Sequence, residues 1–463
     1  MNRIFEYFDI DTVLVQSSVI DFVDCKLNPS FYSANQTFIN GLETKFLYEL
    51  CKDIFNPPVF KREFINDVNE CRYLASAEIS SLEPEIDFIT NEQANKLNLR
   101  VKNGWILVTG FGTIGNIRIV DSIINDFAVA NNVARIIPKE NFTGFIAAFL
   151  SSNYGNKLLN DYAAGAVVKY IEAPQIAQIP IPILPDDIIT ETNDLYLAAV
   201  RCREDAHNLL IKARTLVLEY NNLPPLEEAE FETLDRDKEI DLRLVSTKEF
   251  TDDFRLDANY YNPVAETIIA KLKLSQNKIV YSGELNISAF TPKMFARNYV
   301  DALNGIPFLS GKNLIQIRPT GLKYISKTET NDVSNLLVYK DYILVTRAGT
   351  VGRTIYIYHN YENFAVSDNV LRIIPNSGSI DPGYYYAFLS SDYGFYQIDR
   401  FKHGSVIDVI DDDYLNSLLI PIPEKDQQKE IGDLVRQAYD LRAEAIRLED
   451  EAQEILTKAL TGK

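Results

Sequence analysis

The sequence has few of the residues that build catalytic or metal sites. It contains 3 His and 4 Cys in 463 residues, and Cys25, Cys51, Cys71 and Cys202 have no CxxC spacing. Zinc sites and disulfide frameworks need closely spaced Cys or His, so neither is indicated. No apolar run approaches the roughly 20 residues that cross a bilayer, and the acidic N-terminal residues do not resemble a signal peptide. We therefore expect a cytoplasmic protein without a metal site.

An excess of positive charge is also lacking. The chain has 46 Lys and Arg against 65 Asp and Glu, which gives a net charge of −19. Proteins that bind nucleic acids on their own are usually basic, so this charge balance argues against a protein that binds nucleic acid by itself. The acidic excess is densest at residues 186–240, where 14 acidic residues face 6 basic ones, or −8.

What the sequence does contain is a long internal repeat. ILVTGFGTIGNIRIV at 106–120 returns as ILVTRAGTVGRTIYI at 343–357, an offset of 237 residues, and NVARIIP at 132–138 returns as NVLRIIP at 369–375. Stacked repeats have periods of about 20–50 residues, so each copy here is predicted to be a domain. The offset grows to 239 and then 241 at later matches, and the segment 26–32 is echoed by 255–261.

Each copy shows the same order of expected elements. Gly-bounded runs of Ile, Val, Tyr and Thr predict strands, and short helices are expected at 144–150 and 383–389. An IPIP segment at 179–182 and at 420–423 closes each copy, and Pro at alternate positions predicts an extended edge strand or linker. The expected strands are 105–109, 117–120, 342–346 and 354–358.

After each IPIP segment comes a heptad pattern that predicts a long helix. The two apolar sets are in register at an offset of 239, which favours two helices paired as a coiled coil. The pair is expected to be antiparallel because the second domain lies between the helices. Two ordinary amphipathic helices, each covering its own domain, are the alternative. The sets are Leu195, Ala199, Cys202, Ala206, Leu209, Ala213 and Leu216, and Ile431, Leu434, Ala438, Leu441, Ala445, Leu448, Ala452 and Ile455.

The predicted fold class is therefore α+β. Two similar α/β domains in a pseudo-twofold arrangement are separated by two long antiparallel helices that form a coiled coil. The predicted boundaries are 1–185 for the first domain, 186–222 for its helix, 223–240 for an acidic linker, 241–423 for the second domain and 424–463 for its helix.

Two enzyme-like motifs are better explained by structure. GFGTIG at 110–115 matches the dinucleotide fingerprint, but β-like residues follow it and no acidic residue stands about 20 positions on. We predict a strand–turn–strand, with Gly112 and Gly115 at positive φ. NPPV at 56–59 lacks the aromatic residue of an amino-methyltransferase motif, and we interpret it as a helix stop. No catalytic triad is indicated.

The positions where the copies differ are the most informative for binding. In the turn, Gly110-Phe111 becomes Arg347-Ala348 and Asn116 becomes Arg353, while AAGAVV at 163–168 becomes KHGSVI at 402–407. Arg can bond guanine in two places, and Lys, Ser and Thr can hold phosphates. The candidate DNA-binding residues are Thr109, Thr113, Asn116, Arg118, Lys312, Asn313, Arg347, Thr350, Arg353, Lys402, His403 and Ser405.

The ordered set LVTRAGTVGR, SDNVLRIIP, YAFLSSDYG, GSVI, IPIP and LEDEAQEIL, present in two versions, resembles the DNA-specificity subunit of type I restriction–modification enzymes. The resemblance covers about residues 20–463. It implies that each domain is a target recognition domain reading one half of a bipartite DNA site. The helices would act as a ruler between the half-sites and bind two methyltransferase subunits. The residues implied to form this helical pair are Leu195, Ala199, Ala206, Leu209, Leu216, Leu434, Leu441, Ala445, Leu448 and Ile455.

The chemistry implied by the resemblance lies on partner subunits. The methyltransferase subunits would use S-adenosylmethionine, restriction subunits would add ATP- and Mg-dependent activities, and this chain would carry no catalytic residues and no cofactor. Two alternatives remain open. One is a protein-interaction scaffold or DNA-mimic decoy that uses the acidic surface, and the other is an enzyme built on the 110–115 or 56–59 motif.

Overall fold

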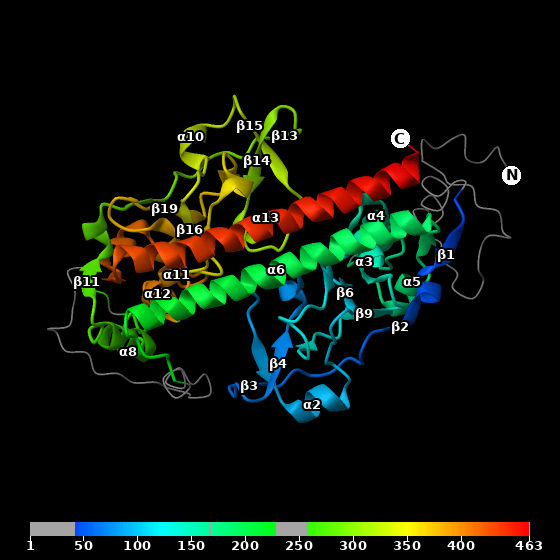
Figure 1. The fold of residues 1–463 in the computed structure, drawn as a ribbon, viewed down its shortest axis with the longest axis horizontal. Helices are drawn as coiled ribbons and strands as arrows, with labels where there is room; N and C mark the ends of the chain where they lie inside the picture. The colour runs from blue at the N-terminus through cyan, green and yellow to red at the C-terminus, as the bar shows by residue number, and fades with distance from the viewer. Residues whose placement is uncertain (1–41, 166–167, 228–254, 256, 463) are drawn as a thin grey trace. The chain divides into compact units, whose positions relative to one another are not determined.

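The computed structural model describes residues 42–165, 168–227, 255 and 257–462 (Figure 1). Cys25, the predicted opening segment 26–32 and the acidic linker from residue 228 onward lie outside the described residues. The chain divides into two compact units: unit 1 contains residues 1–204 and 445–463, and unit 2 contains residues 205–444. Both divisions fall inside long helices, whereas the predicted boundaries fall at helix ends. The predicted domain scheme therefore stays a prediction.

Unit 1 contains two four-stranded sheets. The first has the order β2-β9-β6-β7 and the second the order β3-β5-β4-β8, while β1 (Thr44–Phe46) pairs with β10 (Pro180–Pro182). The strands of the first sheet are Cys51–Phe55, Val133–Pro138, Ile106–Thr109 and Ile117–Ile119, and those of the second are Phe64–Ile65, Asp87–Ile89, Cys71–Leu74 and Ala128–Val129. Its short helices are α2 (Asn91–Lys96), α3 (Thr143–Ser151), α4 (Asn153–Asp161) and α5 (Ala173–Ala177).

Unit 2 repeats this topology strand for strand. Its sheets have the orders β12-β19-β16-β17 and β13-β15-β14-β18, and β11 (Lys278–Tyr281) pairs with β20 (Leu419–Ile422). The strands are Ser288–Phe290, Val370–Ile374, Ile343–Thr346 and Thr354–Tyr356, then Tyr299–Val300, Lys323–Ser326, Gly305–Leu309 and Ala365–Val366. Its short helices are α8 (Pro263–Leu272), α9 (Gly311–Leu314), α10 (Val333–Leu336), α11 (Pro382–Leu389) and α12 (Asp392–Asp399). The α+β class with two similar domains is confirmed.

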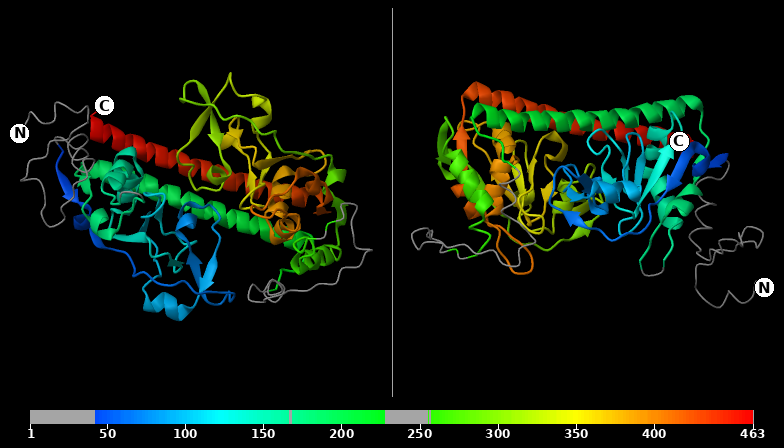
Figure 2. Two further views of the ribbon diagram at one scale, coloured as in Figure 1. Left: turned by 180° about the vertical axis from the view of Figure 1, so that it is seen from behind. Right: turned by 90° about the horizontal axis from the view of Figure 1, so that it is seen from below.

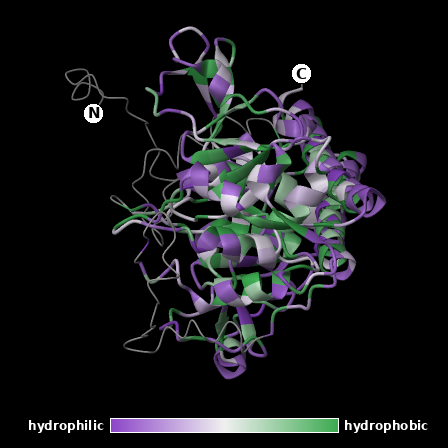
Figure 3. Ribbon diagram, turned by 90° about the vertical axis from the view of Figure 1, so that its left-hand side faces the viewer, coloured by the Kyte–Doolittle hydropathy of each residue, from purple (hydrophilic) through white to green (hydrophobic). Residues whose placement is uncertain are grey.

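The central strands and the helix behind them form the core of each unit. β6 is buried along its whole length, as is β16, and α3 and α11 bury nearly every side chain. Figure 3 shows the apolar residues gathered on the strands and helices inside the fold. The IPIP segments contribute to β10 and β20, each in a two-stranded sheet, because alternate prolines cannot donate to a central ladder.

The interpretation of 56–59 as a helix stop is wrong. The residues before it form strand β2, and they pair with β9. Asp53-Ile54-Phe55 contains only one apolar β-branched residue, which left the strand without a clear alternating pattern. Residues 56–63 then cross from one sheet of unit 1 to the other.

The long helices are α6 (Asp186–Tyr220, 35 residues) and α13 (Lys425–Thr461, 37 residues). In unit 1, Ala445 and Leu448 cluster with Ala199, and Arg203 Nη1 lies 2.6 Å from Glu449 Oε1. A later part of α13 thus meets an earlier part of α6, as expected for antiparallel helices. In unit 2, the Tyr220 hydroxyl near the end of α6 donates to Glu430 near the start of α13 at 2.6 Å. Within each unit the segments of the two helices lie side by side, as the left view of Figure 2 shows.

The buried stripe on each helix differs from the predicted heptad seam at alternate positions. The predicted alanines Ala199, Ala206, Ala213, Ala438, Ala445 and Ala452 are fully buried. The predicted Leu195, Leu209, Leu216, Leu434, Leu441 and Ile455 are only half-buried. The residues that follow five of them are buried instead: Tyr196, Leu210, Val217, Val435 and Leu456.

The physical reason is that each helix has two neighbours. On each helix the buried alanines form a central stripe. The half-buried leucines lie along one side of this stripe. The buried residues that follow those leucines lie along the other side and enter the core of a unit. Leu210 and Val435 belong to the core of unit 2, and Leu456 to that of unit 1. The helices therefore pair with each other and also cover their units. The alternative interpretation, in which each amphipathic helix covers its own domain, describes one of the two buried faces.

Candidate nucleic-acid interface

Each unit carries a tight turn with the same hydrogen-bonded frame. In unit 1, the Thr109 hydroxyl donates to the Thr113 carbonyl at 2.6 Å and accepts from the Asn116 amide at 3.0 Å. In unit 2, the Thr346 hydroxyl donates to the Thr350 carbonyl and accepts from the Arg353 amide at 3.0 Å. The frame is made by one buried threonine, so it does not depend on the side chains at the turn's tip.

The glycines of the turn supply backbone conformations that other residues rarely adopt. Gly112 and Gly115 have φ of +73° and +87°, and Gly349 and Gly352 have φ of +80° and +88°. These values lie in the left-handed region, which glycine enters without a Cβ clash. The strand–turn–strand prediction is confirmed, and the 110–115 motif has no helix after it to bind a dinucleotide.

A second loop is joined to each turn by main-chain hydrogen bonds. The Ile171 amide donates to the Gly110 carbonyl at 2.9 Å, and the Ile410 amide donates to the Arg347 carbonyl at 3.1 Å. We call residues 110–116 with 163–165 and 168–171 the tip of unit 1. Residues 347–353 with 402–410 form the tip of unit 2. The sequence changes noted at the turn and near the exit of each copy thus lie together in space.

The tip of unit 2 presents cations held by carboxylates. Arg347 Nε donates to the Ile410 carbonyl at 3.0 Å and its Nη2 to Asp411 Oδ1 at 2.9 Å, while His403 Nε2 lies 3.4 Å from Asp411 Oδ2. Lys402 Nζ lies 2.6 Å from Asp399 Oδ1. These contacts fix the cations in position, and the Arg347 side chain remains 28% exposed.

The exposed part of the same tip is mostly uncharged. Thr350 and Ser405 are exposed, Val406 is 92% exposed and Ile407 is 59% exposed, and Asp408 is the exposed acidic residue of the loop. An apolar loop end beside a fixed arginine combines the two kinds of contact that read base edges, hydrogen bonds to guanine and apolar contact with the thymine methyl group.

The tip of unit 1 has a different surface on the same frame. Phe111 stands next to the position equivalent to Arg347 and stacks on Tyr170, with ring centroids 5.4 Å apart and planes at 13°. Thr113 is exposed, and Asn116 is half-buried. An aromatic pair and small polar groups stand in place of Arg347 and its neighbours, and the exposed cation of this tip, Lys169, occupies the position of Asp408 in unit 2. The two tips therefore cannot make the same set of contacts.

Two predicted contact residues are corrected by their burial. Thr109 is 2% exposed and holds the turn. Arg118 is 6% exposed, and its guanidinium donates to the Ile79 and Ser81 carbonyls and to Asp121 at 3.3 Å. Neither side chain faces solvent, so neither contacts a duplex in this conformation. Both are framework residues.

The remaining predicted residues have mixed surroundings. Lys312 is exposed on α9. Asn313 lies in that helix and completes a capping box with Ser310, because its Oδ1 accepts from the Ser310 amide at 3.1 Å, and its Nδ2 donates to the Thr320 carbonyl at 3.0 Å. Arg353 is half-buried. The contacts of Thr113, Asn116, Lys312, Asn313, Arg347, Thr350, Arg353, Lys402, His403 and Ser405 with DNA stay predictions.

Sequence reasoning missed a buried arginine behind each tip. Arg135 and Arg372 are fully buried at equivalent positions of β9 and β19. Arg135 donates to the Ala130 carbonyl at 2.9 Å and also to the carbonyls of Leu99, Val129 and Val133. Burial lowers the pKa of each guanidinium to about 9. The signal was present in the repeated segments NVARIIP and NVLRIIP, where the arginine is retained.

These arginines position the loop against which each turn closes. Arg372 donates to the Ser367 carbonyl at 2.8 Å and to those of Val366, Val370 and Leu336. The next carbonyls in the loop, those of Asn132 and Asn369, accept from the Gly110 and Arg347 amides, both at 3.1 Å. One buried cation thus links two sheets of its unit and the base of its tip.

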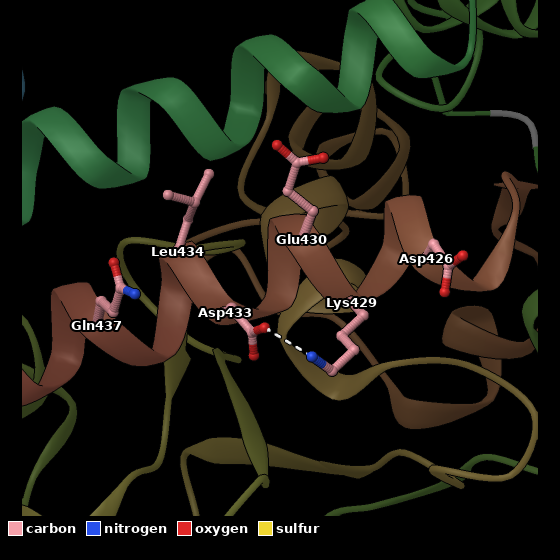
Figure 4. Close-up of a pocket in the computed structure, with 6 residues that line it drawn as sticks. All are labelled: Asp426, Lys429, Glu430, Asp433, Leu434 and Gln437. Carbon is pink, nitrogen blue, oxygen red and sulfur yellow. Dashed lines mark hydrogen bonds and ion pairs between the residues drawn. The ribbon is translucent and has the colours of Figure 1, made fainter.

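The solvent side of α13 in unit 2 carries acidic residues near its start. Figure 4 shows Asp426, Lys429, Glu430, Asp433, Leu434 and Gln437 around a shallow pocket, with Glu430 and Leu434 directed toward α6. Lys429 Nζ lies 3.3 Å from Asp433 Oδ2. In unit 1 the two helices are joined by Arg203 and Glu449, whose Nη1 and Oε1 are 2.6 Å apart and mostly buried.

No helix in the described part of the chain has a stretch long and apolar enough to cross a membrane. Within the described ranges, no three His, Cys, Asp or Glu side chains gather where they could hold a metal ion. Cys51, Cys71 and Cys202 are free thiols.

Two tips with one frame and unequal side chains are what we expect of a binding protein that recognises two related but different features of its ligand. The family model described as the type I restriction modification DNA specificity domain matches residues 40–189 and 288–452. The chain therefore belongs to this family, and it is a DNA sequence-specificity subunit of a type I restriction–modification system.

The chain is also similar to solved structures of such subunits. It is 14% identical to the S subunit of a type I restriction–modification system from M. genitalium, covering 90% of this chain and 94% of that one, with a TM-score of 0.32. It is 15% identical to the HsdS subunit from Thermoanaerobacter tengcongensis, covering 91% and 97%, with a TM-score of 0.28. No curated protein matches the sequence. The family membership rests on the family model.

Proposed function

We propose that the tip of each unit reads one half of a bipartite DNA site. The tip of unit 2 would use Arg347, Lys402 and Ser405, and the tip of unit 1 would use Thr113 and Asn116 beside its aromatic pair. The observation that carries this proposal is the identical threonine frame under different side chains. A common frame presents side chains in the same geometry, so different residues on it select different base pairs.

We propose further that α6 and α13 set the distance between the half-sites and bind two methyltransferase subunits. At ~1.5 Å per residue each helix is about 50–55 Å long, more than one turn of B-DNA at ~3.4 Å per base pair. The pairing of the two helices in unit 1 through Ala199, Ala445 and the Arg203–Glu449 ion pair supports this role.

In this proposal the chain itself is not catalytic and works in the cytoplasm. The methyltransferase subunits bind S-adenosylmethionine and methylate adenine N6. In a complex that includes restriction subunits, ATP and Mg²⁺ are bound there. The role left to this chain is positioning, which is consistent with the hydrogen-bonded and stacked groups at its tips.

The deciding experiment maps methylated adenines in a genome that carries this chain and its methyltransferase. We expect a single motif with two specified halves and an unspecified gap of fixed length. Exchanging residues 347–353 and 402–410 for those of a related chain should change one half only. Methylation at sites with one specified block, or changes in both halves, would contradict the proposal.

The acidic surface favours a second candidate, a DNA-mimic decoy that occupies a partner's basic channel. Reversing the charge of Arg347, Arg353 and Lys402 separates the two. A reader loses recognition of one half-site, whereas a decoy keeps inhibiting its partner. The cations fixed by Asp411 and Asp399 at the tip of unit 2 support the reader.

A further inference from the structure

A segment that crosses between the two sheets of each unit is repeated with the same exposure. Residues 56–65 read NPPVFKREFI and residues 291–300 read TPKMFARNYV, an offset of 235. Position by position, the two segments have the same succession of half-buried, buried and exposed residues. We call these segments the crossover strips. Their match is too weak to notice in the sequence, because only Pro, Phe and Arg are identical.

Part of each strip is retained for packing. Pro57 and Pro292 are buried, and Phe60 and Phe295 pack on the cores of their units. The exposed aromatic residues also repeat one geometry. Phe64 lies edge-on to Tyr73 with centroids 5.6 Å apart, and Tyr299 lies edge-on to Phe308 at 6.4 Å. These contacts explain the shape of the strip and leave its outer residues unexplained.

The outer residues are apolar and cationic. Val59 and Met294 occupy equivalent positions and are each 89% exposed, so they add nothing to the core. Lys61 and Arg62 follow in unit 1, and Lys293 and Arg297 flank Met294 in unit 2; all are exposed. The strips carry net charges of +1 and +2 in a chain of −19, so they favour an anionic ligand more than the rest of the chain does.

Each strip adjoins the tip of its unit through one shared loop. In unit 1, Asn56 Nδ2 donates to the Asn131 carbonyl at 3.0 Å, and the next carbonyl, Asn132, accepts from Gly110 in the tip. In unit 2, Arg297 Nη2 donates to Asp368 Oδ1 at 2.8 Å, and the next carbonyl, Asn369, accepts from Arg347 in the tip. Strip and tip therefore belong to one connected surface in each unit.

We propose that the crossover strips bind the sugar–phosphate backbone of duplex DNA beside each half-site, without reading its sequence. This rests on the proposed function. The tips differ because the bases at the two half-sites differ, whereas the strips are alike because the backbone is the same at both. Lys61 and Arg62, with Lys293 and Arg297, hold phosphates, and Val59 and Met294 contact deoxyribose carbons.

The test measures DNA binding by the complex of this chain with its methyltransferase as a function of salt. The variants are Lys61→Gln with Arg62→Gln in unit 1, and Lys293→Gln in unit 2. A double variant at the exposed Lys45 and Lys52, on β1 and β2 of unit 1, matches the first in charge and serves as its control. All substitutions are at exposed positions, and thermal melting by circular dichroism checks that the fold is kept.

We expect the Lys61/Arg62 variant to lower the slope of log K against log salt by about 2, and Lys293→Gln by about 1. Affinity should fall roughly 10- to 100-fold at ~0.1 M salt for the double variant, by the same factor for every sequence. The methylated motif and the control slope should not change.

Three outcomes overturn the inference. An unchanged slope shows that the strips do not touch phosphates. A change in the preferred bases shows that they read sequence. Weaker assembly with the methyltransferase at an unchanged slope shows that they bind a protein. Arg347→Ala is measured beside these variants. If no complex, including that of the parent chain, prefers any DNA sequence, the proposed function itself fails. If the parent complex prefers a sequence but the strip variants leave the salt slope unchanged, only this inference fails.

Discussion

At the scale of single residues, the threonines and arginines behind the tips hold the backbone of the tips in place, and the side chains that face solvent do not. Thr109 and Thr346 close the turns, and Arg135 and Arg372 bind four carbonyls each in the loops beneath them. A buried donor that satisfies several carbonyls is costly to remove, because each carbonyl then loses its partner away from water. The shape of each tip therefore depends on residues that are buried beneath it.

Replacing Arg372 by Met should destabilise unit 2 by roughly 3–5 kcal/mol, since it leaves several buried carbonyls without a donor. Hydrogen exchange of the β19 amides measures this loss, with the exposed Lys323→Met as a control expected to change stability by less than ~0.5 kcal/mol. The half-site read by unit 1 should be unaffected. Equal losses of stability for the two variants would show that the hydrogen bonds of Arg372 do not stabilise unit 2.

Arg347→Ala should weaken binding by roughly 1–3 kcal/mol at one base pair if its guanidinium bonds guanine twice. The comparison uses a set of duplexes that differ at single positions of one half-site. A uniform loss over all duplexes would make Arg347 a phosphate contact instead. Discrimination at the other half-site should stay as it is in the parent chain.

The buried thiol of Cys51 should resist alkylation in the native chain. Burial raises the pKa of Cys51 to about 12, so the reactive thiolate is scarce at pH 8 as well as shielded. Peptide mass spectrometry after iodoacetamide treatment should show little modification at Cys51 until denaturant is added. Rapid labelling of Cys51 in the native protein would contradict its burial in the core of unit 1.

At the scale of elements, the long helices show how far the sequence could predict the structure. Their extents and the alanines between them followed from heptad spacing, because small residues at every seventh position permit close approach. The positions of Tyr196, Leu210 and Val435 did not follow, since a one-dimensional pattern does not say that a helix has a second buried face. The strand before Asn56 was missed for a similar reason: its burial comes from β9, which is about 80 residues away in the sequence.

Ala445→Leu should destabilise the helix pairing by about 1–3 kcal/mol, because Ala445 is fully buried against Ala199 and has no room for a larger side chain. Gln437→Leu, at an exposed position of the same helix, serves as the control and should change stability little. Chemical denaturation followed by circular dichroism measures both. Equal stability of the two variants would mean that the alanine stripe is not tightly packed.

At the scale of the whole molecule, duplication with divergence was predictable, and the exposure of the candidate binding residues was only partly so. The repeat itself predicted two similar units, and the turn at 347–353 was recognised from the changed residues. Arg118 was wrongly placed on the surface, because a lone cation in a strand gives no sign of whether a carboxylate such as Asp121 is buried beside it. The crossover strips were missed because their likeness is one of exposure more than of residue identity.

The net charge of −19 leads to an expectation about assembly. We expect the isolated chain to bind DNA poorly and the complex with its methyltransferase to bind it tightly, because the partner supplies much of the phosphate contact. Gel shifts with and without the methyltransferase test this. Tight and specific binding by the chain alone would contradict it.

A four-residue insertion near Ala206, matched in α13, should lengthen the ruler by ~6 Å, or about two base pairs. The preferred gap between half-sites should change, and the bases within them should not. Methylome mapping of the variant measures both. Altered half-site bases would contradict the ruler.

The threonine frame of the turns also bears on how such a protein changes over generations. Because Thr109 and Thr346 close their loops through main-chain atoms, the side chains at the outermost positions contribute little to the stability of the fold. Under the proposed function, a single nucleotide change there would alter what is recognised while the scaffold stays intact. New target preferences would then be one mutation away, and two independently varying halves would multiply the number of combinations that a lineage can sample.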